Sequence, residues 1–394
     1  MSKTVAATTS SGMVLVALGL STFITSLLTI GPTPFFPQIA ADLDVSIPLL
    51  GQVMSAMLLL SAVCGLVTGP LADRSGNLLL ILAGLAAAVV CLFSFAFAPV
   101  YPALYLASAA GGLTTAAVLG PSFAVASTAF TGAAARRAVG WTNSAQAGSA
   151  IVGVPLLTAI GAAAGWRMAF IAAGAAAAAV LVIAAIGLPR DRRRTTEPLR
   201  PRAILAPYRP LLGSVTTRRL YTATLLAAVC WFGFITYLGA FLATGLGLEI
   251  GQVGMVYMVS GACYFAGSLI AGGALASVPA HRLAVAGFGA MAICWAVVFS
   301  ARLGVAGSVF VLACAALAMG IAVVSMIAVL SASTPREYGS TTLTLYTVLH
   351  KLGSAAGGAI GGLLLAFAGF DALAIALPLF GLTAALLGWP RNRP

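Results

Sequence analysis

The sequence predicts an all-α membrane protein with 12 transmembrane helices in two pseudo-symmetric six-helix bundles. Composition, long apolar runs and an internal repeat each support this fold class. Of the 394 residues, 61% are apolar and only 7% are charged, whereas a soluble domain is about a quarter charged. Because surface that faces water must be polar, most of the surface of this chain has to contact lipid.

Long apolar segments follow one another along nearly the whole chain. Only α-helices and closed β-barrels satisfy their backbone hydrogen bonds in hydrocarbon, and these segments lack the alternation of polar and apolar residues that barrel strands show. A helical span needs about 20 residues, so the chain has room for twelve. We expect spans at 12–36, 47–70, 78–98, 102–130, 138–163, 166–188, 219–243, 251–275, 283–301, 304–331, 340–368 and 372–388.

Lys and Arg fall mainly on one side of the expected spans. Cytoplasmic loops keep most positive charge, and a cytoplasmic N-terminus puts every Lys and Arg in a cytoplasmic segment except Arg167, Arg302 and the intramembrane Lys351. We therefore expect a multi-pass protein of the cell membrane with both termini in the cytoplasm. The net charge of +12 is then a topology signal, and its division among short loops argues against nucleic-acid binding.

A polar stretch rich in Pro and Arg divides the chain near its middle. It predicts an N-terminal six-helix bundle at 1–188, a cytoplasmic linker at 189–218 and a C-terminal six-helix bundle at 219–394. The linker is the longest polar segment of the chain, and its charge is typical of a solvated loop that sets orientation.

The two bundles carry related sequences. The segment that begins at Gly69 aligns with the one that begins at Gly273, an offset of 204 residues, and Gly148-Ser-Ala aligns with Gly353-Ser-Ala at an offset of 205. The same register thus recurs about 80 residues later. Parallel repeats of this kind build a central pathway between two bundles.

Three segments resemble a known family. Residues 69–76, GPLADRSG, resemble the G-x-L-A-D-R-x-G signature of the major facilitator superfamily, between the second and third expected spans. Residues 32–53, PTPFFPQIAADLDVSIPLLGQV, resemble the first loop of its 12-helix drug:proton antiporter branch, and Gly165-Trp-Arg resembles the usual start of span six. The resemblance implies the major facilitator fold and secondary transport of a small organic solute by alternating access.

The signature segment has a physical interpretation of its own. We expect Asp73 just beyond the cytoplasmic end of span two, where a carboxylate favours the N-terminus of a neighbouring helix, with Arg74 as a charged partner. Gly69 and Gly76 allow close helix approach and a tight turn. Such contacts would latch one conformation, which is a gating role; the alternative is a plain loop that sets topology.

Other positions depart from the family pattern. Ser108 stands where span four of the antiporter branch carries an Arg, and Ser277 occupies the position in the second half that Asp73 has in the first. The span-five pattern is only partly matched. All eight carboxylates lie in expected loops or at span edges, whereas proton-driven carriers commonly use a buried acid. These departures weaken the antiporter assignment.

Two ionisable residues lie inside span eleven. A charge at this depth is costly and indicates function by default. We expect Lys351 to face the central cavity and attract an anion, and His350, with a pKa near 6.5 in water, to be the proton-coupling candidate. The alternative is that Lys351 extends to the cytoplasmic surface and His350 bonds a neighbouring helix. Helical spacing places Thr347 on the face of Lys351, and Tyr346 on that of His350.

Further polar and aromatic side chains are predicted to line the same pathway. By the repeat, Gln146 corresponds to Lys351. Hydroxyl and aromatic groups also serve helix packing, so each has a structural alternative. The predicted substrate-binding set consists of Thr25, Thr29, Gln52, Asn143, Gln146, Trp231, Tyr237, Tyr257, Tyr346, Thr347 and Lys351.

Three functional classes remain open. The first is an exporter of drugs or metabolites, which the resemblance favours and which would couple to protons. The second is an organic-anion carrier or facilitator with Lys351 as the anion site. The third, a non-transport receptor or enzyme, is disfavoured because the sequence has no catalytic dyad or metal-ligand spacing. We expect no cofactor and no metal, a small-molecule substrate, and a monomer in the lipid bilayer.

Overall fold

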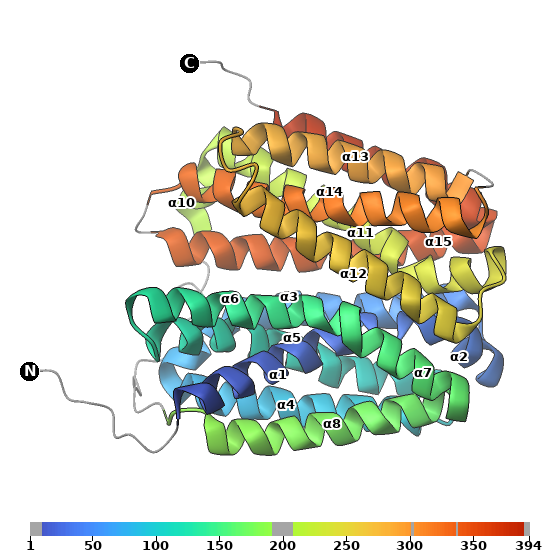
Figure 1. The fold of residues 1–394 in the computed structure, drawn as a ribbon, viewed down its shortest axis with the longest axis horizontal. Helices are drawn as coiled ribbons and strands as arrows, with labels where there is room; N and C mark the ends of the chain where they lie inside the picture. Colours follow the sequence, from blue (N-terminus) through green and yellow to red (C-terminus); the bar gives the residue numbers. More distant parts are fainter. Residues whose placement is uncertain (1–9, 191–207, 301–302, 336–337, 390–394) are drawn as a thin grey trace, which may run out of the picture.

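The computed structural model describes residues 10–190, 208–300, 303–335 and 338–389. Within these ranges every secondary-structure element is a helix, and the long helices lie along one common axis (Figure 1). Most of the predicted linker, residues 191–207, lies outside the described residues. The expected all-α membrane fold is confirmed.

The first half of the chain forms one bundle. Its last two helices, α7 and α8, pack on each other and are separated by a single residue, Gly165. The elements are α1 (Ser11–Ile30), a 3-10 turn (Thr33–Phe35), α2 (Phe36–Asp42), α3 (Ile47–Ser75), α4 (Asn77–Ala96), α5 (Ala103–Thr128), α6 (Gly132–Gly148), a π-helical segment (Ser149–Gly153), α7 (Val154–Ala164) and α8 (Trp166–Gly187).

The second half forms the other bundle. Its elements are α10 (Arg209–Gly213), α11 (Val215–Ala240) with a π-helical extension (Phe241–Gly245), α12 (Ile250–Gly272), α13 (Ala280–Ser300), α14 (Gly304–Ala332) and α15 (Gly339–Gly388). Helix α15 is broken at Ala368 and Gly369, whose φ angles are −145° and 70°. Eleven helices are long and apolar enough to cross a membrane; counted as two across this break, α15 makes twelve spans in the described ranges.

Glycine in the left-handed region ends helices at matching places in the two halves. Gly165 (φ 84°) separates α7 from α8, and Gly369 (φ 70°) breaks α15. Side chains disfavour positive φ, so glycine is the residue that such turns require. The two glycines are 204 residues apart, which is the repeat offset found in the sequence.

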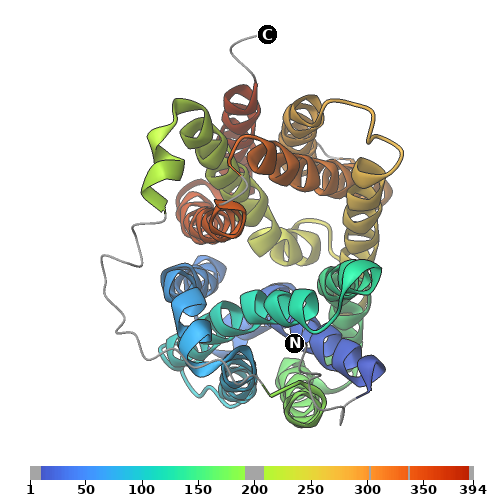
Figure 2. The same ribbon diagram turned by 90° about the vertical axis from the view of Figure 1, so that its left-hand side faces the viewer.

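The molecule has two ends that the chain distinguishes. We call the end where α8 stops at Gly187 and α11 starts at Val215 the linker end, and the end that carries α2 the far end (Figure 1). Figure 2, seen from the linker end, shows the two bundles facing each other. The predicted topology places the linker end in the cytoplasm.

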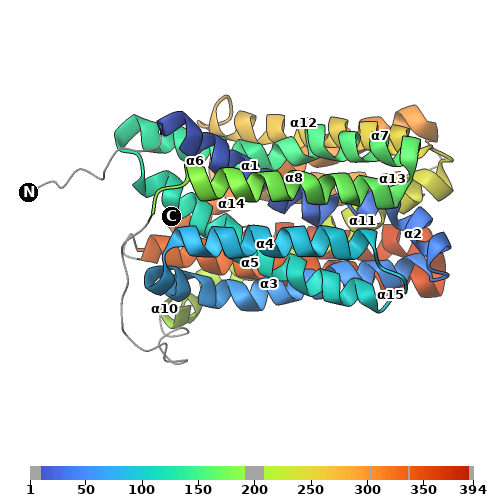
Figure 3. The same ribbon diagram turned by 90° about the horizontal axis from the view of Figure 1, so that it is seen from below.

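Two pairs of helices join the bundles. Helix α3 packs on α15, and α12 packs on α7 and the π-helical segment before it. Figure 3 shows the two pairs on opposite sides of the molecule. We call them the α3–α15 seam and the α7–α12 seam.

Candidate functional site

Lys351 connects the two bundles at mid-depth. It lies twelve residues after the start of α15 at Gly339, about 18 Å along the helix at 1.5 Å per residue. Its ammonium donates to the Ser61 hydroxyl on α3 and, at 2.9 Å, to the Thr115 carbonyl on α5. Ser61 is fully buried. The amine therefore points into the opposite bundle and does not extend to the cytoplasmic surface.

The partners of Lys351 are neutral oxygen atoms. An ammonium has three donors, and two of them are used in the bonds to Ser61 and Thr115. Among the described residues, the salt bridge is between Arg167 and Asp42 (2.7 Å) at the far end, so no described carboxylate pairs with Lys351. A cation without a carboxylate partner is costly in hydrocarbon and indicates a functional site.

His350 points in a different direction from its neighbour Lys351. Its ring contacts Phe232 of α11 at 5.7 Å, edge to face, and stacks on Tyr346 at 5.9 Å. Successive helical residues are rotated by about 100°, so Lys351 faces the N-terminal bundle while His350 faces aromatic rings of its own bundle. The shared face of Tyr346 and His350 follows from their i, i+4 spacing.

Further aromatic side chains contact one another within the C-terminal bundle. Trp231 lies 6.2 Å from Tyr264 on α12 and 5.7 Å from Trp295 on α13. Trp231 and Tyr264 are half-buried, whereas Trp295 is fully buried. Aromatic rings of this kind suit stacking on a flat or cationic solute.

Three of the predicted substrate-binding residues hold the far end together. Tyr257 is hydrogen-bonded to Thr33 of the N-terminal bundle at 2.8 Å and donates to the Ile235 carbonyl at 3.2 Å. Gln52 donates to the Ala359 carbonyl across the α3–α15 seam at 3.1 Å. Tyr237, with no exposed surface, donates to the Gly358 carbonyl at 2.8 Å. Tyr257 and Gln52 thus close the two bundles on each other at the far end, whereas the bond of Tyr237 lies within the C-terminal bundle.

The threonines of α1 bond to the backbone. Thr25 is fully buried and donates to the Ser21 carbonyl (2.8 Å), and Thr29, half-buried, donates to the Thr25 carbonyl (3.0 Å). Thr22 reaches the Thr142 carbonyl on α6 at 3.0 Å. These bonds favour a structural role for the threonines over solute binding. A hydroxyl that donates to a carbonyl of its own preceding turn needs no partner in the pathway.

The remaining polar candidates are at least partly open. Asn143 and Thr347 are exposed, and Gln146 is half-buried. Gln146 lies three residues before the π-helical segment that starts at Ser149. Single π-turns are frequent at functional sites, and this one was not foreseen. Gly148, which precedes the segment, and Gly153, which is its last residue, are the signal that could have indicated it.

The signature segment lies at the end of α3. Asp73 is in the last turn of this helix, which ends at Ser75, and directly follows the candidate membrane span Ile47–Ala72; its side chain lies outside the described part of the structure. Gly76 (φ 86°) makes the tight turn into α4, as predicted. A Cβ added at Gly69 would meet none of the described atoms within 4 Å, so none of the described helices approaches closely there in this conformation. Arg74 is half-buried.

Two groups of functional interest were missed. Ser61 and Thr115 had no distinguishing pattern, because single hydroxyl residues are frequent in apolar helices. The pair of Arg167 with Asp42 joins α8 to α2, and Arg167 also donates to the Ala96 carbonyl (2.9 Å). The sequence contained a signal for this pair, since Arg167 and Asp42, which lies between the first two expected spans, both fall on the outer side of the predicted topology.

Comparison with known proteins agrees with this arrangement. The family model described as Major Facilitator Superfamily matches residues 18–348. The chain is 28% identical over 257 residues to the uncharacterized MFS-type transporter YceJ of Bacillus subtilis (strain 168), an alignment that covers 65% of this chain and 63% of that protein.

Solved structures share the fold. The nucleoside transporter NupG superposes with a TM-score of 0.77 at 12% identity, covering 95% of this chain and 98% of that one. The human organic anion transporter MFSD10 superposes with a TM-score of 0.71 at 16% identity, covering 96% and 99%. A bacterial homologue of the human lysosomal transporter Spinster, inward-facing and unoccupied, gives 0.74 at 15% identity over 96% and 95%.

Proposed function

Since the chain belongs to the major facilitator superfamily, we propose that it is a secondary transporter that moves a small organic solute across the cell membrane by alternating access. The two bundles are closed on each other at the far end by the Tyr257–Thr33 and Gln52–Ala359 hydrogen bonds. With the predicted topology, the far end is outside, so these two bonds close the pathway on its outer side. Transport then requires these contacts to break while the linker end closes.

The solute class follows from one observation, the environment of Lys351. Its amine is at mid-depth and is held by a hydroxyl and a backbone carbonyl from the opposite bundle. A carboxylate or phosphate adds to the hydrogen bond an attraction between opposite charges that a neutral hydroxyl or carbonyl lacks, so such a group would displace Ser61 and Thr115. We therefore favour a solute that carries an anionic group.

This exchange also links binding to the movement of the bundles. While Lys351 bonds to α3 and α5, it ties α15 to the N-terminal bundle. An anion that takes over the ammonium removes this tie and replaces it with contacts of its own. A ligand shifts a conformational equilibrium only by its different affinity for the two states, and the exchange at Lys351 supplies such a difference.

A second candidate is efflux of a drug or metabolite by proton antiport. The half-buried rings of Trp231 and Tyr264 and the His350–Tyr346 stack favour it, because such a surface suits flat or cationic solutes. His350 would carry the proton, since the described carboxylates lie at helix ends or in loops. The resemblance to the drug:proton antiporter branch supports the same proposal.

The test is uptake and counterflow in proteoliposomes with organic anions and their uncharged analogues. We expect Lys351→Ala to abolish anion transport and Lys351→Arg to retain part of it. Arg218→Ala, which removes an exposed cation at the start of α11, serves as the matched control. Wild-type rates in Lys351→Ala would contradict the anion proposal. A substrate-dependent pH change that His350→Gln removes would instead favour the antiporter.

A further inference from the structure

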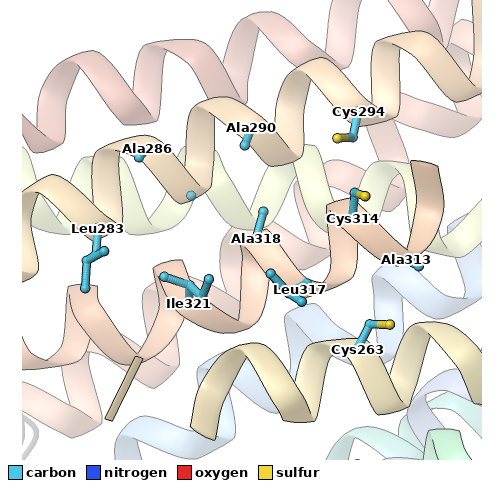
Figure 4. A pocket seen from close by; sticks show the side chains of 11 residues that line it. Cys263, Leu283, Ala286, Ala290, Cys294, Ala313, Cys314, Leu317, Ala318 and Ile321 are labelled. Atoms are coloured by element: carbon cyan, nitrogen blue, oxygen red, sulfur yellow. The ribbon is translucent and has the colours of Figure 1, made fainter. Parts of the chain in front are cut away.

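A groove lies on the outer side of the C-terminal bundle, apart from the seams. It has a volume of about 540 Å³ and is lined by residues of α12, α13 and α14 (Figure 4). Its walls include Leu283, Ala286, Ala290 and Cys294 of α13, Cys314 of α14 and Cys263 of α12. Ala286, Ala290 and Cys314 are exposed, so the groove is open to the surroundings of the protein.

The groove exists because its helices approach closely while their outward side chains are small. A Cβ at Gly287 would meet the Ala318 carbonyl oxygen at 2.7 Å, and one at Gly320 would overlap the Tyr264 backbone. These contacts bring α13 and α12 against α14 at the floor. Alanines at 286 and 290 leave the space above the floor unfilled.

The chemistry of the walls selects a hydrocarbon occupant. The lining side chains are aliphatic apart from thiols, which behave as small hydrophobic groups. A water molecule needs two to four polar partners to stay in such a space, and the lining offers none of that kind. On a helix pair that crosses a membrane, the molecules available to fill the groove are lipid acyl chains.

One end of the groove is positively charged. Leu283 marks the linker end of the lining, and the preceding residues are Arg282, which is exposed, and His281, which is half-buried. From Leu283 to Cys294 the groove follows α13 for about 16 Å at 1.5 Å per residue. The predicted topology places Arg282 in the cytoplasmic leaflet, which carries the anionic lipids.

We propose that this groove binds one acyl chain of an anionic phospholipid, with the headgroup held at Arg282. The proposal does not depend on which solute is transported, because the groove is separate from Lys351 and from both seams. It assigns the groove to a lipid site of the cytoplasmic leaflet.

The experiment uses the full-length protein in nanodiscs that contain phosphatidylglycerol with a photoreactive diazirine in its acyl chain. After illumination, mass spectrometry locates the labelled peptides. We expect labelling of α13 and α14 to exceed that by the matched phosphatidylcholine probe about five-fold, since one basic residue near an anionic lipid contributes about 1 kcal/mol. Arg282→Gln should lower the phosphatidylglycerol signal to the phosphatidylcholine level.

A groove-filling variant tests the acyl chain independently of the headgroup. Ala290→Phe should remove the labelling of α13 with either probe, while Ile293→Phe, on the lipid-facing surface of α13 outside the lining, should leave it unchanged. Arg218→Gln is the matched charge control. Equal labelling by both lipids, no loss in Ala290→Phe, or cross-linking of α13 to a second copy of the chain would each overturn the proposal; thermal unfolding of each variant confirms that it is folded.

Discussion

The two seams join the same pair of bundles by different chemistry. The α3–α15 seam is polar, with an ammonium bonded to Ser61 and Thr115 and the Gln52 amide bonded to Ala359. The α7–α12 seam is built on missing side chains: a Cβ at Gly254 would overlap the Thr158 hydroxyl, and one at Gly261 would lie 2.7 Å from the Ala150 Cβ. Close approach is common to both seams, because a Cβ at Gly358 of α15 would lie 2.6 Å from the Ser55 hydroxyl of α3. The difference is that the α3–α15 seam also holds an ammonium that can respond to a charged solute.

The largest effect is expected from adding volume to the α7–α12 seam. Gly254→Val forces α12 away from Thr158 and from the Pro155 backbone, which a Cβ would meet at 3.2 Å. Overpacking of this kind destabilises by about 1–3 kcal/mol, and we expect loss of most transport together with a lower unfolding temperature. Transport assays and thermal unfolding in detergent measure the two effects.

The matched control lies one turn earlier on the same helix. A Cβ at Gly251 meets nothing within 4 Å, so Gly251→Val makes the same change in helix propensity without the overlap. If the two variants behaved alike, the close approach at Gly254 would have no part in function, and the contrast between the seams would fail.

A smaller and opposite effect is expected in the α3–α15 seam. Ser61→Ala removes one acceptor from Lys351, which leaves the ammonium more available to an anion. A hydrogen bond to a charged group contributes at least about 1.5 kcal/mol, so the apparent affinity for an anionic substrate should rise about ten-fold. Concentration dependence of uptake measures it.

Ser55→Ala provides the control for this change. Ser55 lies in the same helix and seam, but its hydroxyl donates to the Gly51 carbonyl of its own turn at 2.9 Å. We expect an unchanged affinity in this variant. A weaker affinity in Ser61→Ala would mean that the serine itself contacts the solute, and that Ser61 does not compete with the solute for the Lys351 ammonium.

The sequence predicted the architecture well because each span leaves a strong local signal. Twenty apolar residues identify a span on their own. The break in α15 at Ala368 and Gly369 falls at the end of the expected span 340–368 and before the one at 372–388. Helical spacing also predicted which residues share a face, as the Tyr346–His350 stack shows.

The direction in which each face points was harder to predict. In water a polar stripe marks the exposed side of a helix, but in lipid both the outer and the packed sides are apolar, so the pattern loses this information. Thr25 and Tyr237 were expected in the pathway and are fully buried. Lys351 was expected to be exposed to a cavity; its partners are 290 and 236 residues away in the chain, and nothing near it in sequence indicates them.

The smallest effect concerns the far end, where one hydroxyl group spans the boundary between the bundles. Tyr257→Phe keeps the ring and removes the bond to Thr33 and the bond to the Ile235 carbonyl. Only the bond to Thr33 crosses the boundary, so opening of the far end breaks one hydrogen bond fewer, about 1 kcal/mol. Opening of the far end should become about five-fold more frequent. Labelling of a cysteine introduced at Thr29, half-buried on α1, by a water-soluble maleimide from the far side measures this opening.

Tyr264→Phe, on the same helix as Tyr257 but away from the boundary, is the control. Unchanged labelling in Tyr257→Phe would show that the close packing of the α7–α12 seam closes the far end without help from this hydrogen bond, and the division between a polar and a packed seam would then hold at the far end as well.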